Sequence, residues 1–450
     1  MILQKVRDRF DYLKDHQGFK KYFHNAKWLF ISHFFKLTLG VFVGVWVARY
    51  LGPDRYGLLS YSVAFVGLFS AIASLGLDEI VIREIVKFPE NKNVYLGSAF
   101  ILKIAGSFLI FTLLFFLVYF TSKDRQANLL ILIIAGSTIF GSFSVIDLYF
   151  QANVLSKYSV FANILSLLAS SIFKILLVLY KFPLIYFAFP FVFNGLILAI
   201  GYIYFYNFIN RKNYPVQSII KGNRLLNWKF DTKIAIRLLK YSWPLILSGT
   251  TLMFHARIDQ VMLKMMVGNT ETGYYSVAIR LIEIFGFIPI ILSSSLFPYV
   301  MKVEESLKSI RLSNYYRLNF ILFLLVAVPI FIFSKKVIIL LFGYKYEQSA
   351  VLLSLLSIRL FFTNMGVARG MFILKENLLK YSLITMIIGM LTNIIFNFLL
   401  IPMYKAEGSI IATFFSFFVT IFLIDIFYKK TRSNVILMFK SIITFYKISI

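Results

Sequence analysis

Cysteine is absent from the 450-residue sequence, and charged residues are scarce. Without cysteine there is no disulfide framework, thiolate metal site, cysteine nucleophile or iron–sulfur cluster. Charged residues make up 15% of the chain, against about 25% in typical soluble domains, so too little polar surface exists to cover a water-facing exterior. The histidines His16, His24, His33 and His255 lack the spacing of metal ligands. These absences argue against a soluble enzyme and predict no metal site.

The motifs of ATP-driven and catalytic proteins are missing too. Gly52 and Gly57 have the spacing of two phosphate-loop glycines, but Leu58 and Leu59 follow in place of the Lys and Ser/Thr that hold phosphate and magnesium. No Gly-x-Gly-x-x-Gly follows a strand, and no Ser/His/Asp set is evident. We therefore expect no enzyme activity and no cofactor. A membrane protein of this kind is most simply a secondary transporter or a channel, with an integral membrane transferase as an alternative.

Apolar residues are abundant instead. The hydrophobic class is 59% of the chain and the mean hydropathy is +0.79, so lipid must be the solvent for much of the surface. A spanning helix needs about 20 mostly apolar residues. We place about twelve such runs at 28–50, 57–77, 95–120, 128–150, 158–180, 184–208, 241–266, 274–298, 317–334, 349–373, 380–403 and 406–428. The sequence predicts an all-α polytopic membrane protein with about 12 transmembrane helices.

Basic residues far outnumber acidic ones. Lys and Arg total 47 and Asp and Glu total 20, a formal charge of +27. In a polytopic protein this excess is typical of cytoplasmic loops, so we expect a lipid bilayer as partner and no nucleic acid. With the N-terminus in the cytoplasm, inside segments hold roughly 30 Lys and Arg and outside segments roughly 9. Both termini are therefore predicted to be cytoplasmic.

A short repeat relates the two halves of the chain. Leu51–Ser60 and Val267–Ser276 both read apolar-Gly-x4-Gly-x2-Ser and are offset by 216 residues. Six apolar runs lie on each side of the most basic segment, which predicts two pseudo-symmetric six-helix lobes. The predicted organisation is a cytoplasmic N-terminal segment 1–27, an N-lobe 28–208, a basic cytoplasmic linker 209–240, a C-lobe 241–428 and a cytoplasmic C-terminal segment 429–450.

Several runs contain basic residues, which are costly in a bilayer and usually functional. Four of them lie roughly 12–22 Å from the nearer helix end, too deep for easy snorkelling: Lys36, Lys103, Arg257 and Arg359. Arg369 lies closer to an end and is interpreted as snorkelling. We expect a hydrated, cationic central cavity that binds an anionic substrate. Its predicted residues are Lys36, Lys103, Arg257, Arg280 and Arg359. The alternative for each is a structural ion pair between helices or a snorkelling side chain.

Three carboxylates within the runs are candidates for proton or sodium coupling, because a desolvated carboxylate can take up a proton. They are Asp147, Asp259 and Glu283. Each can instead be an ion-pair partner. Glu283 follows Arg280 by three residues and Asp259 follows His255 by four, so these pairs can meet on one helix face. Arg257 and Asp259 are two residues apart and point away from each other.

Four segments resemble polysaccharide-biosynthesis flippases. Ala48–Gly57 resembles their A-R-x-L-G-x-x-x-[YF]-G turn, and Leu75–Asp78 with the Arg-Glu pair that follows resembles the segment after their second helix. Arg257–Asp259 resembles the Arg-Ile-Asp of their seventh helix, and Gly273–Ala278 resembles the start of their eighth. The chain is thus similar to the Wzx-type O-antigen and capsule flippases of the multidrug/oligosaccharidyl-lipid/polysaccharide exporter superfamily.

This resemblance implies a MATE-like fold in a bacterial inner membrane. It also implies a substrate, an oligosaccharide on polyprenyl pyrophosphate, that moves to the outer leaflet by alternating access; glycan polymerase machinery is then a candidate partner. A cationic cavity suits the pyrophosphate. Three alternatives stay open. A cation-coupled drug or metabolite antiporter of the same fold is disfavoured by a cationic cavity. Lipid II flippases usually have extra helices, and glycan polymerases or ligases usually have a long outside loop.

Overall fold

The computed structural model describes residues 17–121, 123–213, 226–301 and 305–447, and in these ranges it is almost entirely helical, with no β-strand. Among the described residues, nine helical stretches are long and apolar enough to cross a membrane. They are Ile31–Leu68, Pro89–Phe120, Arg125–Ala152, Ser156–Leu179, Leu184–Arg211, Asn269–Phe297, Ser309–Phe342, Ser349–Lys375 and Leu379–Phe427. Parts of the predicted N-terminal segment and basic linker, 1–16 and 214–225, lie outside the described residues. The predicted all-α polytopic class is confirmed.

Two of these stretches contain a sharp kink. Helix α2 (Gln17–Leu68) includes Gly52, with φ 71° and ψ 171°, and α16 (Leu379–Phe418) includes Lys405, with φ 50° and ψ −129°. Each kink divides a long stretch into two spans. Helix α11 (Thr232–Met266) is also long enough to cross a bilayer, although it is less apolar. Counted in this way, the described helices agree with the prediction of about twelve spans.

Contacts between residues divide the chain into two compact units that interleave along the sequence. Unit 1 contains the residues up to Gly44 together with Phe69–Thr250, and unit 2 contains Val45–Leu68 and the residues from Thr251 onward. This grouping follows contacts rather than chain order. The predicted lobes at 28–208 and 241–428 therefore stay a prediction.

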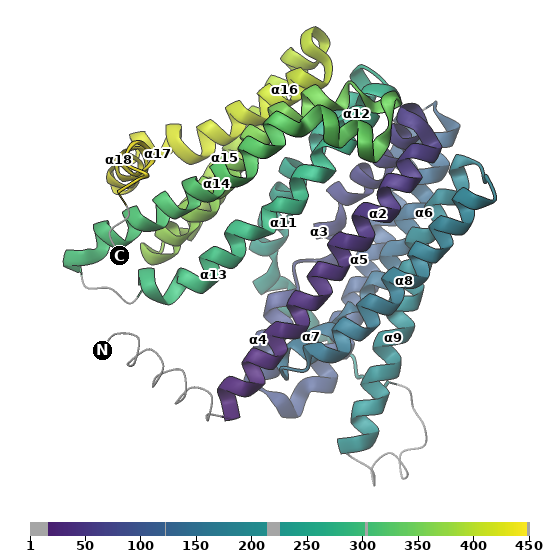
Figure 1. Cartoon of the computed structure of the whole chain (residues 1–450). Helices are drawn as coiled ribbons and strands as arrows, with labels where there is room; N and C mark the ends of the chain where they lie inside the picture. Colours follow the sequence, from purple (N-terminus) through teal and green to yellow (C-terminus); the bar gives the residue numbers. More distant parts are fainter. Residues whose placement is uncertain (1–16, 122, 214–225, 302–304, 448–450) are drawn as a thin grey trace. The chain divides into compact units, whose positions relative to one another are not determined.

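In unit 1, four long helices form the main packing. Helix α9 packs against α6 and α8, and α6 packs against α5 (Figure 1). The helices that lie wholly in this unit are α3 (Ser70–Ser74), α4 (Asp78–Lys87), α5 (Lys92–Thr121), α6 (Arg125–Gly141), α7 (Val145–Ala152), α8 (Ser156–Leu179) and α9 (Phe189–Asn213). The Asp124 side chain starts α6 by accepting a hydrogen bond from the Ala127 amide at 3.1 Å. Leu77, Ile146 and Phe150 have no water-accessible surface and belong to the hydrophobic core of this unit.

In unit 2, α15 occupies the centre. Its neighbours are α12, α13, α14 and α16. The bounds of the helices are α12 (Asn269–Glu283), α13 (Phe287–Met301), α14 (Glu305–Phe342), α15 (Ser349–Lys375), α17 (Ile424–Phe427) and α18 (Lys429–Ile443), with a π-helical turn at Val419–Leu423 between α16 and α17. Tyr315, Tyr316 and Met365 are fully buried in its core. Helix α15 therefore packs against four neighbours of this unit.

The two copies of the glycine motif contact each other within unit 2. A Cβ placed on Gly57 would lie 1.8 Å from the carbonyl oxygen of Asn269, and one placed on Gly273 would lie 2.0 Å from that of Pro53. Pro53 and Asn269 occupy corresponding positions of the two copies, so the contact is reciprocal. These glycines therefore permit a close crossing of backbone on backbone, which gives the spacing a structural role.

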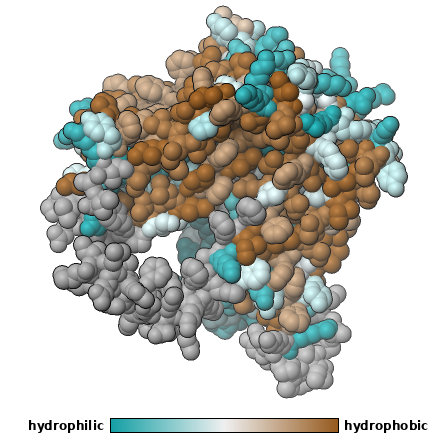
Figure 2. Space-filling model, in the orientation of Figure 1, coloured by the Kyte–Doolittle hydropathy of each residue, from teal (hydrophilic) through white to brown (hydrophobic). Residues whose placement is uncertain are grey.

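Apolar side chains cover much of the helix surface. On α5, Phe116, Tyr119 and Phe120 are exposed, and on α14 so are Leu325 and Ile332. Figure 2 shows apolar residues over most of the visible face. Soluble monomers rarely expose such large apolar patches, whereas a bilayer accommodates them and helices satisfy their own backbone hydrogen bonds there. The chain is a multi-pass membrane protein.

Candidate functional site: charged residues within the spanning helices

Lys103, on α5 of unit 1, is buried and has a carboxylate partner on another helix. Its ammonium lies 2.6 Å from an oxygen of Asp78, the first residue of α4, and donates a hydrogen bond to Ser144 Oγ at 2.8 Å. The pair joins α4 to α5, as expected if Lys103 has the structural role weighed above. Its role in substrate binding stays a prediction.

The other predicted residues of unit 1 are Lys36 and Asp147. Lys36, on α2, is exposed, and no described carboxylate forms an ion pair with it. Asp147, on α7, is half-buried and accepts hydrogen bonds from Ser159 Oγ and from Gln151 Nε2, the latter at 2.9 Å. Among the described residues Asp147 has neutral partners only. The structure therefore gives these two residues no ion pair within the part of the chain that it describes.

Arg257 and Glu283 form an ion pair in unit 2. Arg257 Nη1, on α11, lies 3.3 Å from Glu283 Oε1, at the end of α12, and both side chains are partly exposed. Spacing along the chain predicts that Glu283 can meet Arg280 on one helix face, and the structure places Glu283 beside Arg257 of another helix. Arg280, on α12, donates a hydrogen bond to the Tyr56 hydroxyl at 3.1 Å. The structure therefore gives both Arg257 and Arg280 a described partner within the protein.

Arg359, in the middle of α15, has no ion-pair partner among the described residues. Its guanidinium lies 5.7 Å from the centre of the Phe417 ring, within the range of a cation–π contact. The residue is half-buried. A cation in a spanning helix that lacks a carboxylate needs water or an anionic ligand. Of the predicted cations in unit 2, Arg359 is therefore the best suited to bind an anion.

Asp259, on α11, is buried among neutral donors. The hydroxyls of Tyr275 and Thr413 donate to one carboxylate oxygen at 2.8 and 2.7 Å, and the Asn397 amide donates to the other at 2.8 Å. Only 3% of the residue is exposed, and no described Lys or Arg forms an ion pair with it. Asn397 and Thr413 lie on opposite sides of the α16 kink at Lys405. A carboxylate held in this way can accept a proton or a small cation without breaking an ion pair.

His255 lies one helical turn before Asp259 but bonds to a different helix. Its Nε2 lies 3.0 Å from Ser416 Oγ, and the Ser416 hydroxyl donates to the Gly389 carbonyl at 2.8 Å. Since the hydroxyl hydrogen is used for Gly389, Nε2 is the donor to Ser416. The described contacts include no hydrogen bond between His255 and Asp259. The spacing of four residues thus places His255 and Asp259 on one face of α11, but the two side chains do not form a described hydrogen bond with each other.

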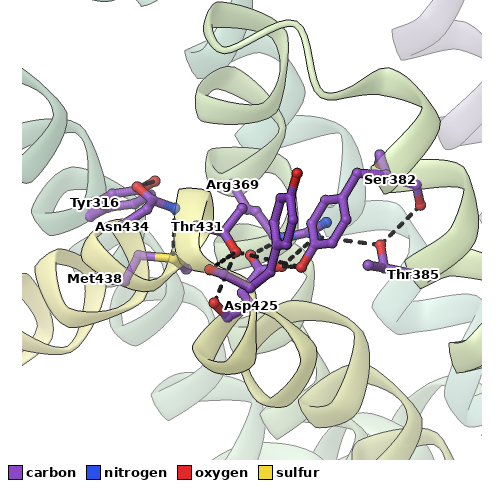
Figure 3. Close-up of polar contacts among 10 residues, drawn as sticks. Tyr316, Arg369, Ser382, Thr385, Asp425, Thr431, Asn434 and Met438 are labelled. Atoms are coloured by element: carbon purple, nitrogen blue, oxygen red, sulfur yellow. Dashed lines mark hydrogen bonds and ion pairs between the residues drawn. The ribbon is translucent and has the colours of Figure 1, made fainter.

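A buried ion pair that the sequence did not predict joins α15 to α17. Arg369 donates to both oxygens of Asp425, at 2.7 and 2.8 Å (Figure 3). The Tyr381 hydroxyl donates to Asp425 at 2.8 Å, and Thr385 Oγ1 accepts from Arg369 at 3.3 Å. Both charged side chains are buried. The interpretation of Arg369 as a snorkelling residue is therefore wrong, because the guanidinium points to a carboxylate inside the unit.

The fold and these sites define a helical, multi-pass membrane protein with charged groups inside its spanning segments. The family model described as "Polysaccharide biosynthesis protein" matches residues 23–304. The chain belongs to this family. The resemblance to polysaccharide-biosynthesis flippases drawn from the sequence is thereby confirmed.

Two curated proteins match most of the chain. The "Uncharacterized membrane protein MJ1068" of Methanocaldococcus jannaschii is 25% identical over 427 residues, which cover 88% of this chain and 81% of that protein. The "Capsular polysaccharide biosynthesis protein CapF" of Staphylococcus aureus is 21% identical over 416 residues, which cover 90% and 99%. Both likenesses extend well beyond the segment that the family model matches.

Solved transporter structures share the fold. The lipid II flippase MurJ in an inward closed conformation has a TM-score of 0.68 at 18% identity, with 92% of this chain and 91% of that chain covered. An inward-facing multidrug resistance MATE transporter of the MOP superfamily has a TM-score of 0.62 at 14% identity, with 92% and 96% covered. At these identities the likeness shows the fold alone, and the predicted MATE-like fold is confirmed.

Proposed function

We propose that the chain is a flippase that moves polyprenyl-pyrophosphate-linked oligosaccharides from the cytoplasmic to the outer leaflet of a bacterial inner membrane by alternating access. The family supports a role in polysaccharide biosynthesis, and the capsule protein and the lipid II flippase among the similar proteins fit this role. The excess of basic residues supports cytoplasmic termini. Such a transporter supplies binding and conformational change rather than covalent chemistry.

Arg359 carries this proposal. A pyrophosphate would supply the negative charge that the described residues do not, and a guanidinium offers it two parallel hydrogen bonds. Lys36, which has no described carboxylate partner, is the corresponding candidate in unit 1. We assign weaker contributions to Lys103, Arg257 and Arg280, because each already has a partner within the protein.

We assign ion coupling to Asp259 in preference to Asp147 and Glu283. Glu283 is partly exposed and already paired with Arg257, and Asp147 is only half-buried. Asp259 combines burial with three neutral hydrogen-bond donors. Binding of a proton or Na⁺ there would neutralise a buried charge, which a gradient of that ion could use to drive the change of conformation.

Complementation of a flippase-deficient strain by Arg359→Ala tests the proposal. We expect glycan export to be lost at normal protein abundance, because the variant strands no described carboxylate. Arg359→Lys should restore part of the export, since the charge is kept and the planar fork is lost. Lys335→Ala, which removes an exposed ion pair with Glu347, is the control and should export normally. Normal export by Arg359→Ala would refute the assignment.

The substrate class is tested by the choice of strain. Lipid II and the proposed oligosaccharide lipid share a pyrophosphate and differ in the glycan, so the phosphate contacts alone do not separate them. If the chain were a lipid II flippase, it would rescue a strain that has been depleted of its lipid II flippase. A drug antiporter would rescue neither strain and would instead raise resistance to cationic compounds. We expect rescue of the oligosaccharide-flippase strain alone.

A further inference from the structure

The C-terminal helix α18 runs across the direction of its neighbours. The backbone leaves the helical region at Tyr428, with φ −88° and ψ 119°, and α18 begins at the next residue. Figure 1 shows α18 nearly end-on, whereas α14, α15 and α16 of the same unit run across the view. If those three helices cross the bilayer, a helix at this angle lies close to the membrane plane.

The polar side of α18 faces the protein. Asn434 accepts a hydrogen bond from the Tyr316 hydroxyl at 2.7 Å, and the Ser441 and Ser313 hydroxyls lie 2.8 Å apart. Thr431 Oγ1 donates to the Asp425 carbonyl at 2.8 Å. These hydrogen bonds fix which face of α18 is turned inward. On the other face, the centre of the Phe439 ring lies 5.1 Å from that of Phe422.

That outer face contains a stripe of apolar side chains. Ile436, Phe439 and Ile443 are 62%, 41% and 74% exposed. Their spacing of three, four and seven residues places them in one stripe along the helix. A stripe of large apolar side chains is costly in water, and here it lies on the face opposite the polar contacts with α14.

Cations border the stripe. Residues 429–447 include five Lys or Arg and no Asp or Glu, and none of the five forms an ion pair with a described residue. The cations within α18 are Lys429, Lys430, Arg432 and Lys440, all exposed. Around the helix axis, Lys429 and Lys440 lie about 20–40° from Ile436 on one side, and Arg432 lies about 40° from it on the other. Arg432 Nε donates to the Ile426 carbonyl at 2.9 Å. Apolar anchors beside cations that have no described carboxylate partner match the two parts of an anionic lipid, its acyl chains and its phosphate.

We propose that α18 is an interfacial helix that binds anionic phospholipids, with the apolar stripe among the acyl chains and the cations at the headgroups. The occupant is the lipid surface and not a second copy of the chain, because two such faces would bring like charges together. The inference goes beyond the transport function, since it holds for any transported substrate.

Single-cysteine labelling of the full-length protein tests the insertion, because a chain without cysteine takes a label only where one is introduced. Phe439→Cys and Ser433→Cys form a matched pair of exposed positions about 120° apart around the helix. In liposomes with spin-labelled acyl chains, we expect strong quenching of a fluorophore at 439 and weak quenching at 433. Equal quenching at both positions would overturn the proposal, as would energy transfer between copies labelled at 439.

Lipid selectivity tests the cations. In nanodiscs that contain phosphatidylglycerol and phosphatidylcholine, we expect the protein to retain phosphatidylglycerol. Replacement of Lys429, Lys430, Arg432 and Lys440 by Gln should lower that preference at least about tenfold. A neutral variant that keeps the wild-type preference would overturn the proposal. The labelling experiment retains all four cations, so it stays decisive if the Gln variant is unstable.

Discussion

Among the described residues of unit 2, two buried carboxylates differ in whether a cation lies beside them. Asp425 is 0% exposed and accepts hydrogen bonds from Arg369 through both oxygens. Asp259 is 3% exposed and accepts hydrogen bonds from Tyr275, Thr413 and Asn397, all of them neutral. Each carboxylate has at least three short hydrogen bonds, so burial and hydrogen bonding do not separate the two sites.

The donors of the two sites respond differently when the carboxylate changes its charge. An arginine only donates and stays charged, so a neutral Asp425 would leave Arg369 as a buried charge without compensation. A hydroxyl donates or accepts, so either Tyr275 or Thr413 can reverse its hydrogen bond and accept the single proton that a neutral Asp259 donates. Asp425 therefore has the partners of a structural ion pair, and Asp259 has those of a group that can change its charge state.

Arg369→Ala is expected to have the largest effect on stability. The variant leaves Asp425 buried without a counter-charge, which costs roughly 3–5 kcal/mol. Protein abundance in the membrane and the melting temperature in detergent should both fall. The double variant Arg369→Ala/Asp425→Ala removes both charges and should regain part of the loss. Wild-type abundance of the single variant would contradict a structural role for the pair.

Arg369→Lys is expected to have a smaller effect. Lysine keeps the charge but cannot place two parallel hydrogen bonds on Asp425, and the loss of one hydrogen bond to a charged group costs roughly 1.5–3 kcal/mol. The melting temperature should lie between those of the wild type and Arg369→Ala. A value equal to that of Arg369→Ala would mean that the geometry of the pair, and not its charge, decides stability.

The membrane fold was predictable because its signal is local. An apolar run long enough to span a bilayer is visible in the sequence alone, and the runs correspond to the described spans. The kinks were predictable only as breaks between runs, because α2 and α16 continue as helices on both sides of Gly52 and Lys405. The contact of Gly57 with the second glycine motif could not be predicted, because it depends on how distant segments pack.

The partners of the buried charges were less predictable for the same reason. Spacing along one helix reaches partners three or four residues away. The partner of Lys103 is 25 residues distant, and Arg369 and Asp425 are 56 residues apart. A comparison of acidic and basic residues at similar depth in different runs would have proposed Asp425 for Arg369. It would not have found the neutral partners of Asp259, because hydroxyls and amides are too common to single out.

Asp259→Asn is expected to have the smallest effect on stability and provides the sharpest test of the comparison. The new amide can keep its oxygen as the acceptor for the hydroxyls of Tyr275 and Thr413, while its nitrogen donates to the side-chain oxygen of Asn397 once that amide has turned over. All these groups stay hydrogen-bonded, so the free energy of unfolding should fall by about 1 kcal/mol or less. The melting temperature should therefore stay close to that of the wild type.

Transport, in contrast to stability, should respond strongly to Asp259→Asn. Asp259→Asn cannot exchange a proton or hold a cation by charge, so glycan export should lose its dependence on the ion gradient at near-normal abundance. Asp425→Asn is the matched control, because the same atom replacement there strands Arg369, and we expect that protein to disappear from the membrane. The measurement is abundance and export for both variants with the proton and sodium gradients collapsed in turn. If Asp259→Asn is depleted as strongly as Asp425→Asn, the carboxylate at 259 is a structural group and the assignment of coupling to it is wrong.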